Sequence, residues 1–391
     1  MSVDRPSYDG EGVVNLMARL AQAFRAPGAG LPALQLEAEL GVDEARTVIL
    51  WVIDGLGDHY LARFPESNLY GHRVQGLTTV FPATTSAALT SIMTGQPPRA
   101  HGVTGWFIYV HELGAVTAWL PFGPRVGKGQ WVDIEPEAES LLEREAVWEA
   151  FDAEVHVVQP HWLVDTPYSR AVTGGKAQRH GYQGLDGLIE TLQRLATAPD
   201  NGQRRFVYAY WPDFDTRCHQ YGVRSGAVLD QFRSIDTAFG RLRSALAGSD
   251  SVLLAIADHG LVDTAPERTI YLDEHPELAD MLALPLCGEP RAAYCYLRPG
   301  TEQAFETYIR ERMGCVCQAF RSEELVAAGW FGPGPEHAQF RRRIGDWVLL
   351  PADGWVIKDR LRGEGPFRQV GVHGGASATE LRVPLIGVGP S

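Results

Sequence analysis

The sequence has 391 residues, of which 45% are hydrophobic and 21% are charged, so the chain can bury a large core and is not typical of a disordered protein. Its 35 Lys and Arg residues against 48 Asp and Glu residues give a formal net charge of −13 at pH 7. This balance argues against a nucleic-acid polymer as partner, although a bound cation would still attract a small anionic substrate.

The start of the sequence is polar and lacks the basic stretch followed by an apolar one that marks a secretion signal. No run of about 18 apolar residues predicts a membrane-spanning helix. The five cysteines are odd in number and lack the spacing of a disulfide framework, which is typical of reduced thiols. We therefore expect a cytoplasmic protein that does not interact with membranes.

In the first quarter of the chain, the predicted elements are two helices and two strands. Apolar positions at helical spacing predict a helix over Val13–Phe24. The continuous apolar run Thr47–Ile53 is typical of a strand buried on both faces of a parallel sheet. A strand over Leu77–Phe81 is expected next, because Pro82 stops strand pairing, and small hydroxyl residues then begin an apolar helix that ends near Gly95.

The second half of the chain contains a strand, helix, strand unit of the parallel kind. The apolar runs Arg205–Trp211 and Ser251–Ala257 predict buried strands, and the pattern between them predicts a helix over Ala227–Leu246. A last strand is expected over Val383–Val388. The fold class that these elements indicate is an α/β sandwich, with a mainly parallel sheet and helices on both faces.

Two segments rich in irregular strands, turns and aromatic residues interrupt this pattern. They cover residues 106–147 and 267–370. We interpret the second, and part of the first, as a smaller cap inserted into a single domain that spans residues 1–391.

Carboxylate and imidazole side chains follow the predicted buried strands, and one histidine precedes the last strand. In open parallel sheets the carboxyl ends of the strands line one crevice, so side chains from distant parts of the sequence can meet there. Such a set suits divalent ions, zinc first, with manganese or iron as alternatives. The six candidate ligands are Asp54, Asp215, His219, Asp258, His259 and His373.

Small hydroxyl residues, Thr84, Thr85 and Ser86, stand at the start of the predicted apolar helix. A hydroxyl at a helix N-terminus receives the positive end of the helix dipole and free backbone N–H groups, which suits an alkoxide and an incoming phosphoryl oxygen. Coordination to a metal would activate that hydroxyl without a neighbouring histidine base. The alternative is an ordinary helix cap, a role in which threonine is common.

The ordered set of motifs resembles the alkaline phosphatase superfamily, and within it the type I phosphodiesterase/nucleotide pyrophosphatase branch. The resemblance implies an alkaline-phosphatase-like three-layer sandwich that covers nearly the whole chain. The matching motifs are Ile53-Asp-Gly55, Phe81-Pro-x-x-Thr85, Thr94-Gly-x-x-Pro-x-x-His-Gly102, Pro212-x-x-Asp-x-x-x-His-x-Tyr-Gly222, Asp258-His-Gly260 and Val372-His-Gly374.

The resemblance also implies a role for each candidate residue. Thr85, four positions after Phe81, would be the nucleophile that becomes transiently phosphorylated between two divalent metal ions. The expected activity is hydrolysis of phosphodiesters or nucleotide pyrophosphates, with a small phosphate ester as substrate. One ion would be held by Asp215, His219 and His373, and the other by Asp54, Asp258 and His259.

Substrate contacts follow the family pattern less closely. Relatives have an aromatic residue directly after the nucleophile, where this chain has Ser86, and an asparagine that would fall near Gly105 or Trp106. Tyr210 occupies a position where relatives have a tyrosine beside the leaving group, so we predict that Tyr210 and Trp106 bind substrate. Sulfatase relatives need a C/S-x-P-x-R motif, which the sequence lacks.

Two other functions remain as alternatives. One is a phosphomonoesterase or phosphonate hydrolase that uses the same pair of ions, and the other is a metal-binding protein without turnover. Two further polar residues are given ordinary roles. His101 is interpreted as a turn residue, and Asp213 as a solvated loop acid in preference to a group that orients His219.

Overall fold

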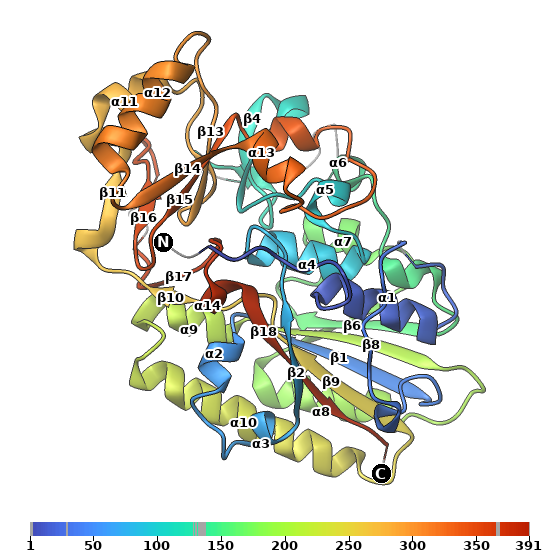
Figure 1. The fold of residues 1–391 in the computed structure, drawn as a ribbon. Coiled ribbons are helices and arrows are strands. Elements are labelled where there is room, and N and C mark those ends of the chain that lie inside the picture. The colour runs from blue at the N-terminus through green and yellow to red at the C-terminus, as the bar shows by residue number, and fades with distance from the viewer. Residues whose placement is uncertain are drawn as a thin grey trace.

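The computed structural model describes residues 3–28, 30–127, 129, 131, 138–364 and 368–390. Two seven-stranded sheets organise this part of the chain (Figure 1). One has longer strands and is called the larger sheet; the other, the smaller sheet, lies beyond one edge of it. Within the described ranges, no helix is both long and apolar enough to cross a membrane.

The larger sheet is mainly parallel, which confirms the predicted fold class. Five of its strands, consecutive in space, pair with one another in parallel, whereas β18 (Arg382–Val388) runs antiparallel to both of its neighbours. β1 is buried along its whole length, as its unbroken apolar sequence predicts. The strands, in spatial order, are β2 (Arg73–Thr78), β18 (Arg382–Val388), β9 (Ser251–Ile256), β1 (Thr47–Ile53), β8 (Arg205–Trp211), β6 (Glu154–Pro160) and β7 (Gln178–Tyr182).

The register of the three central strands brings their carboxyl ends to one level. Val52 of β1 lies beside Tyr210 of β8 on one side and Ile256 of β9 on the other. The backbone N–H of Asp54 continues the pairing by donating to the Trp211 carbonyl. The loops that follow these strands therefore start at the same edge of the sheet, as the sequence predicts.

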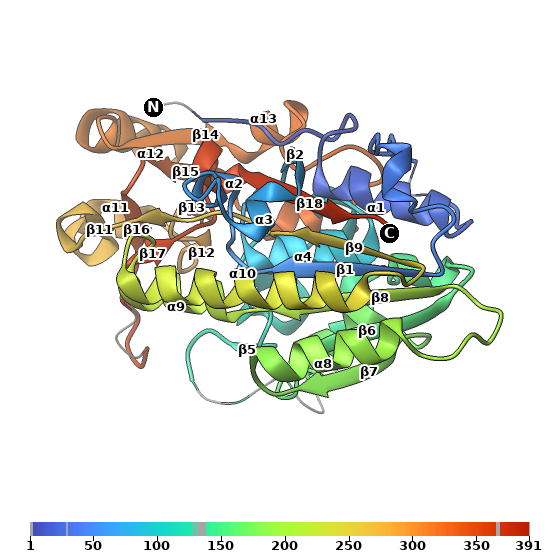
Figure 2. The same cartoon turned by 90° about the horizontal axis from the view of Figure 1, so that it is seen from below.

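Helices cover both faces of the larger sheet (Figure 1), and the turned view shows α8 and α10 side by side along one face (Figure 2). The predicted helices over Val13–Phe24 and Ala227–Leu246 are confirmed to within one residue at each end. The longer helices are α1 (Val13–Ala23), α4 (Thr85–Thr94), α7 (Pro167–Thr173), α8 (Gly184–Ala196), α9 (Asp213–Tyr221), α10 (Gly226–Leu246) and α12 (Glu302–Tyr308).

The prediction of a strand over Leu77–Phe81 is wrong by four residues at its start and three at its end. β2 covers Arg73–Thr78 and stands at the edge of the sheet beside β18, with a half-exposed, polar first half. An apolar run is a poor guide to such a strand, because only one of its sides is covered. Residues 79–84 instead form a turn that contains the cis Phe81–Pro82 peptide bond.

The smaller sheet is antiparallel and combines strands from both segments that interrupt the parallel pattern. β3 of the first segment pairs with β12 of the second at Phe107 and Gly288. The first segment thus contributes three strands to this sheet and the second contributes four. In spatial order they are β14 (Cys317–Arg321), β15 (Trp347–Pro351), β13 (Ala292–Cys295), β12 (Cys287–Glu289), β3 (Phe107–Val110), β4 (Ala115–Ala118) and β5 (Gly123–Pro124).

Short elements connect the two sheets. β10 (Val262–Asp263) pairs with β17 (Gly371–Val372), and β11 (Thr269–Tyr271) pairs with β16 (Val356–Lys358). Between the sheets, the ring of Phe81 packs against Trp330 and Phe331, with centroids 5.0 and 5.3 Å apart. The short helices are α2 (Asp58–Leu61), α3 (Asn68–Gly71), α5 (Pro98–His101), α6 (Ala138–Leu142), α11 (Pro276–Met281), α13 (Ser322–Ala327) and α14 (Ala378–Leu381).

Candidate active site

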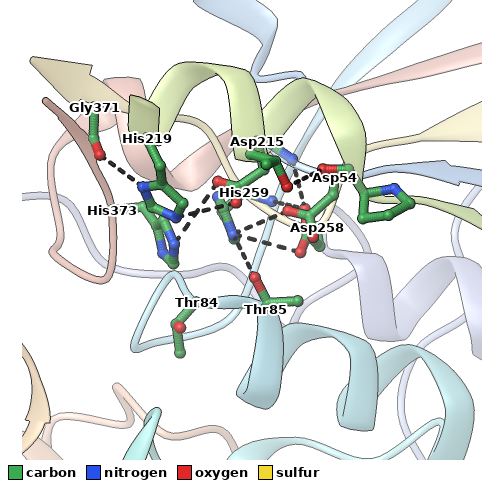
Figure 3. Close-up of polar contacts among 12 residues, drawn as sticks. Asp54, Thr84, Thr85, Asp215, His219, Asp258, His259, Gly371 and His373 are labelled. Carbon is green, nitrogen blue, oxygen red and sulfur yellow. Dashed lines mark hydrogen bonds and ion pairs between the residues drawn. The ribbon is translucent and has the colours of Figure 1, made fainter. Parts of the chain in front are cut away.

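The six predicted ligands converge at the carboxyl-terminal edge of the larger sheet (Figure 3). Asp54 directly follows β1, and Asp258 with His259 comes two residues after β9. Asp215 and His219 lie on α9, which begins two residues after β8, and they share one face of that helix. His373 directly follows β17. Residues up to 319 positions apart in the chain therefore meet because three parallel strands end together.

All three histidines present Nε2 to the centre of the cluster. Nδ1 of His219 lies 2.7 Å from the Gly371 carbonyl oxygen, and Nδ1 of His373 lies 3.2 Å from that of Ala83. Nδ1 of His259 lies 3.2 Å from the Gly260 carbonyl oxygen. Because a carbonyl oxygen can only accept, each Nδ1 donates, and in the neutral imidazole each Nε2 then has its lone pair toward the cluster. This is the orientation in which backbone carbonyls hold metal-binding histidines.

The short distances in the cluster all involve these Nε2 atoms. His219 Nε2 lies 3.0 Å from Asp215 Oδ2, and His373 Nε2 lies 3.9 Å from Asp215 Oδ1. His259 Nε2 lies 3.4 Å from both Asp54 Oδ1 and Asp258 Oδ2. The contacts around Asp215 and those around His259 are adjacent, since the His259 and His373 rings stack with centroids 3.8 Å apart.

Three buried carboxylate oxygens in the cluster have no hydrogen-bond partner within the described part of the chain. They are Asp54 Oδ1, Asp215 Oδ1 and Asp258 Oδ2. A buried carboxylate oxygen without a partner is costly, and a cation would relieve that cost. The donor set therefore fits divalent ions.

In the part of the chain that the structure describes, two groups of three Asp and His residues have ligand atoms within 4.8 Å of one another. They are Asp54, Asp258 and His259, and Asp215, His259 and His373. The first is the set that the resemblance implies for one ion. In the second, His259 stands where the resemblance implies His219, because its ring stacks on His373, while His219 still contacts Asp215.

Burial and neighbouring charges shift the pKa values of the acids, upward for Asp54 and Asp258 and downward for Asp215. Burial, and then the charges of Asp258 and Asp215, raise the pKa of Asp54 well above its usual value. Burial also raises the pKa of Asp258, although His259 opposes this shift. Burial acts to raise the pKa of Asp215 too, but the attraction and hydrogen bond of His219, together with the attraction of His373 and His259, outweigh it, and the net shift is downward. The crowded negative charge favours occupation by cations.

The Thr85 hydroxyl faces this cluster from the first turn of α4. Its Oγ1 lies 3.1 Å from His259 Nε2 (Figure 3). Thr84 occupies the N-cap position, but its side chain points away from the cluster and makes no capping bond. Ser86 Oγ is buried without a hydrogen-bond partner among the described residues. Of the three hydroxyls, Thr85 is the one that contacts a candidate ligand.

The two predicted substrate-binding residues come from different sheets, Tyr210 from β8 of the larger sheet and Trp106 from the residue before β3 of the smaller one. The Tyr210 hydroxyl donates a hydrogen bond to Asp54 Oδ2, and the side chain is buried on β8. Trp106 is half-buried just before β3. Contact of either residue with substrate stays a prediction, but Tyr210 has a structural role that the sequence did not indicate: it orients Asp54.

The interpretation of His101 as a turn residue is wrong. His101 ends α5, is fully buried, and its Nε2 lies 2.8 Å from Ser91 Oγ of α4. Asp213 is the half-exposed first residue of α9. The Gly371 carbonyl, not Asp213, is the partner of His219 Nδ1.

One acid beside the site was not predicted. Glu289, the last residue of β12, is buried, and its Oε1 accepts hydrogen bonds from Thr84 Oγ1 at 2.5 Å and from the Trp106 N–H at 2.7 Å. Burial raises its pKa to about 7, although both hydrogen bonds act to lower it. It lies in an irregular segment about 200 residues after Thr84, so no local motif marks it.

A mainly parallel α/β sandwich with a hydroxyl facing buried carboxylates and imidazoles at its carboxyl edge defines an alkaline-phosphatase-like hydrolase. The chain belongs to the type I phosphodiesterase / nucleotide pyrophosphatase family, whose model matches residues 48–376. The family resemblance that the motifs indicate is thereby confirmed.

Curated relatives are distant. The human ectonucleotide pyrophosphatase/phosphodiesterase family member 1 is 23% identical over 270 residues, which cover 66% of this chain and 27% of the human protein. Bovine family member 3 is 24% identical over 242 residues, or 58% of this chain and 26% of that protein. The chain therefore spans about a quarter of the length of these two relatives. An uncharacterized pyrophosphatase/phosphodiesterase of Schizosaccharomyces pombe is 23% identical over 359 residues, covering 84% of this chain and 68% of that protein.

Solved structures show the same fold. Murine ectonucleotide pyrophosphatase/phosphodiesterase 5 superposes with a TM-score of 0.64 at 17% identity, and 88% of each chain is covered. A second structure of that murine protein, an inactive variant in complex with AMP, matches equally well.

Proposed function

We propose that this protein hydrolyses phosphodiesters or nucleotide pyrophosphates through a phosphothreonine formed on Thr85, with two divalent ions, zinc first and manganese or iron as alternatives. The observation that supports this proposal most is the position of Thr85 Oγ1, 3.1 Å from His259 Nε2, beside three buried carboxylate oxygens that lack partners among the described residues. Membership of the family supports the same chemistry.

The residues of the cluster would hold the ions in two neighbouring sets. Asp54, Asp258 and His259 form one set, and Asp215, His219 and His373 the other, with His259 close to both. When bound, the ions would supply Lewis-acid stabilisation of the charge that develops on the attacking and departing oxygens.

The remaining chemistry belongs to the chain itself. The Thr85 hydroxyl loses its proton to solvent, and its oxygen forms a bond to phosphorus while the bond from phosphorus to the leaving oxygen breaks. The leaving oxygen takes up a proton. The first N–H groups of α4 have no partner within the helix, so they donate toward a phosphoryl oxygen. Water then attacks the phosphothreonine and restores the hydroxyl.

A phosphomonoesterase or phosphonate hydrolase remains the second candidate, and one observation favours it. Ser86 and Ala87, which follow Thr85, are small and fully buried, so neither can stack a nucleobase. Comparing the hydrolysis of bis(p-nitrophenyl) phosphate with that of p-nitrophenyl phosphate separates the two. A strong preference for the monoester would replace the first candidate.

Thr85→Ala tests the nucleophile. The variant should bind zinc as tightly as the wild type but lose at least about 10³-fold in turnover of bis(p-nitrophenyl) phosphate, the usual scale for deletion of a nucleophile. Ser86→Ala is the matched control, since it removes a neighbouring hydroxyl without a hydrogen-bond partner in the described residues. Retained activity in Thr85→Ala would exclude the mechanism. If the zinc-loaded wild type hydrolyses no ester of a broad panel, a metal-binding role without turnover becomes the better explanation.

A further inference from the structure

Glu289 reaches from the smaller sheet into the turn that carries the nucleophile. Only 7% of the residue is exposed. Its Oε1 accepts both the Thr84 hydroxyl and the Trp106 N–H, so one carboxyl group connects the residue before Thr85 with the start of β3. The Thr84 hydroxyl and the Trp106 N–H therefore both donate to the Glu289 carboxyl group and are not available to another acceptor beside Thr85.

Close backbone packing keeps Glu289 in this position. A Cβ at Gly374, whose φ is +103°, would lie 2.5 Å from both Cβ and Cγ of Glu289. A Cβ at Gly105 would lie 2.6 Å from the Cα of Gly288. Glycine at these two positions lets β12 approach both the residue after His373 and the residue before Trp106. Glu289 is therefore enclosed between the nucleophile turn and the loop of a candidate ligand.

In mildly alkaline solution, where the carboxyl group is ionised, this placement adds one negative charge beside a site for phosphate esters. Glu289 accepts from the hydroxyl of Thr84, and the next residue, Thr85, lies 3.1 Å from His259 Nε2, so the carboxylate lies within electrostatic reach of the cluster. A carboxylate in a buried position repels a second anion much more strongly than an exposed one does. A phosphodiester brings one negative charge to the site, whereas a phosphomonoester in mildly alkaline solution brings two.

We propose that Glu289 is a specificity-determining residue, whose carboxylate beside the Thr84–Thr85 turn disfavours dianionic phosphomonoesters and thereby selects monoanionic phosphodiesters. This inference rests on the proposed hydrolysis of phosphate esters at Thr85. A purely structural role would be different: holding Thr84 and Trp106 in place needs only the hydrogen-bond acceptor of Glu289, whereas selecting substrates by charge needs its negative charge.

Glu289→Gln separates these two roles, since glutamine keeps an oxygen that can accept from Thr84 and Trp106 but removes the charge. In mildly alkaline buffer, the ratio of kcat/KM for p-nitrophenyl phosphate to that for bis(p-nitrophenyl) phosphate should rise at least about tenfold in this variant, the smallest effect expected from like charges across a desolvated site. Glu289→Ala, which also loses the anchor, should lower both rates. Asp353→Asn is the charge control, because this carboxylate belongs to the same part of the molecule but contacts Arg291 at the surface; its ratio should stay that of the wild type.

A binding measurement tests the inference without turnover. The zinc-loaded Glu289→Gln variant should bind inorganic phosphate at least about tenfold more tightly than the wild type does, with little change for dimethyl phosphate, which carries one charge. An unchanged rate ratio together with an unchanged phosphate Kd would overturn the role of Glu289. Wild-type protein that hydrolyses neither ester would instead contradict the proposed function, and the phosphate Kd would still decide the charge effect.

Discussion

Single hydrogen bonds decide which atoms of the site face inward. Asp54 has one oxygen bonded by the Tyr210 hydroxyl and one without a partner in the described structure. Asp258 shows the same division, since its Oδ1 accepts from the N–H groups of Gly55 and His259 at 2.9 Å each. In both residues the bonded oxygen fixes the carboxylate so that the other oxygen is available to a cation.

Tyr210→Phe should therefore weaken zinc binding by about 10- to 100-fold, the usual effect of removing a group that orients a metal ligand. Competition with a chromogenic chelator would measure this change. Tyr208→Phe is the matched control on the same strand, because the Tyr208 hydroxyl has no hydrogen-bond partner within the described residues. Equal zinc affinity in the two variants would contradict the orienting role of Tyr210.

The turn between β12 and β13 joins the smaller sheet to the loop that carries His373. Arg291 in this turn donates to Glu380 of α14, and Glu380 also accepts from the Ser377 hydroxyl and from the Gly375 N–H. Arg291 and Glu380 are both buried. Burial acts to raise the pKa of Glu380, but the attraction of Arg291 and the hydrogen bonds from Arg291, Ser377 and Gly375 together outweigh it and hold that pKa below its usual value.

Glu380→Gln should lower the free energy of unfolding by about 3–5 kcal/mol, because it leaves the buried Arg291 guanidinium without its buried counter-charge. Urea denaturation would measure the loss. Asp353→Asn removes the exposed partner of the same arginine and should change the free energy by less than about 1 kcal/mol. Similar losses in the two variants would show that burial of the pair is unimportant.

At the level of elements, continuous apolar strands were predictable and pairings between distant segments were not. β1, β8 and β9 match their predicted ranges to within one residue, because strands buried on both faces have an unbroken apolar sequence. The convergence of the six candidate ligands follows from those three strands. Glu289 could not be predicted, since its position depends on the pairing of Gly288 with Phe107 across the two segments of the smaller sheet.

Among the described residues outside the candidate active site, three buried histidines lie in two regions: His156 in β6, and His101 with His337, which packs against the adjacent Gly102. Burial, followed by nearby positive charge, lowers the pKa of His156 in β6 to about 4 and that of His337 to about 4. Burial likewise holds the pKa of His101 well below 6.5. Each of these histidines therefore binds a proton less readily in the folded protein than in the unfolded chain.

The protein should therefore lose stability as the pH falls from about 6.5 to about 4, the window between the unfolded and folded pKa values. Above this window the histidines are neutral in both states. Below it, His156 and His337 are protonated in both states. Between the two limits only the unfolded chain binds the protons, so the free energy of unfolding decreases with falling pH.

Urea denaturation at several pH values would measure this slope, and His337→Gln should reduce it. His111→Gln, at an exposed histidine, is the control and should keep the wild-type slope. A slope that is the same in all three proteins would show that His337 does not contribute to acid sensitivity.

The order of strands in the larger sheet has a consequence for synthesis of the chain. β18 begins at residue 382 but lies between β9 and β2, and β2 has no other neighbour in the sheet. Until β18 has left the ribosome, β9 and β2 each keep an unpaired edge, which is a template for association with other chains. Nascent chains of this protein are thus expected to depend on chaperones until β18 has been synthesised, and a stop codon shortly before residue 382 should give insoluble product even though every candidate ligand has been made.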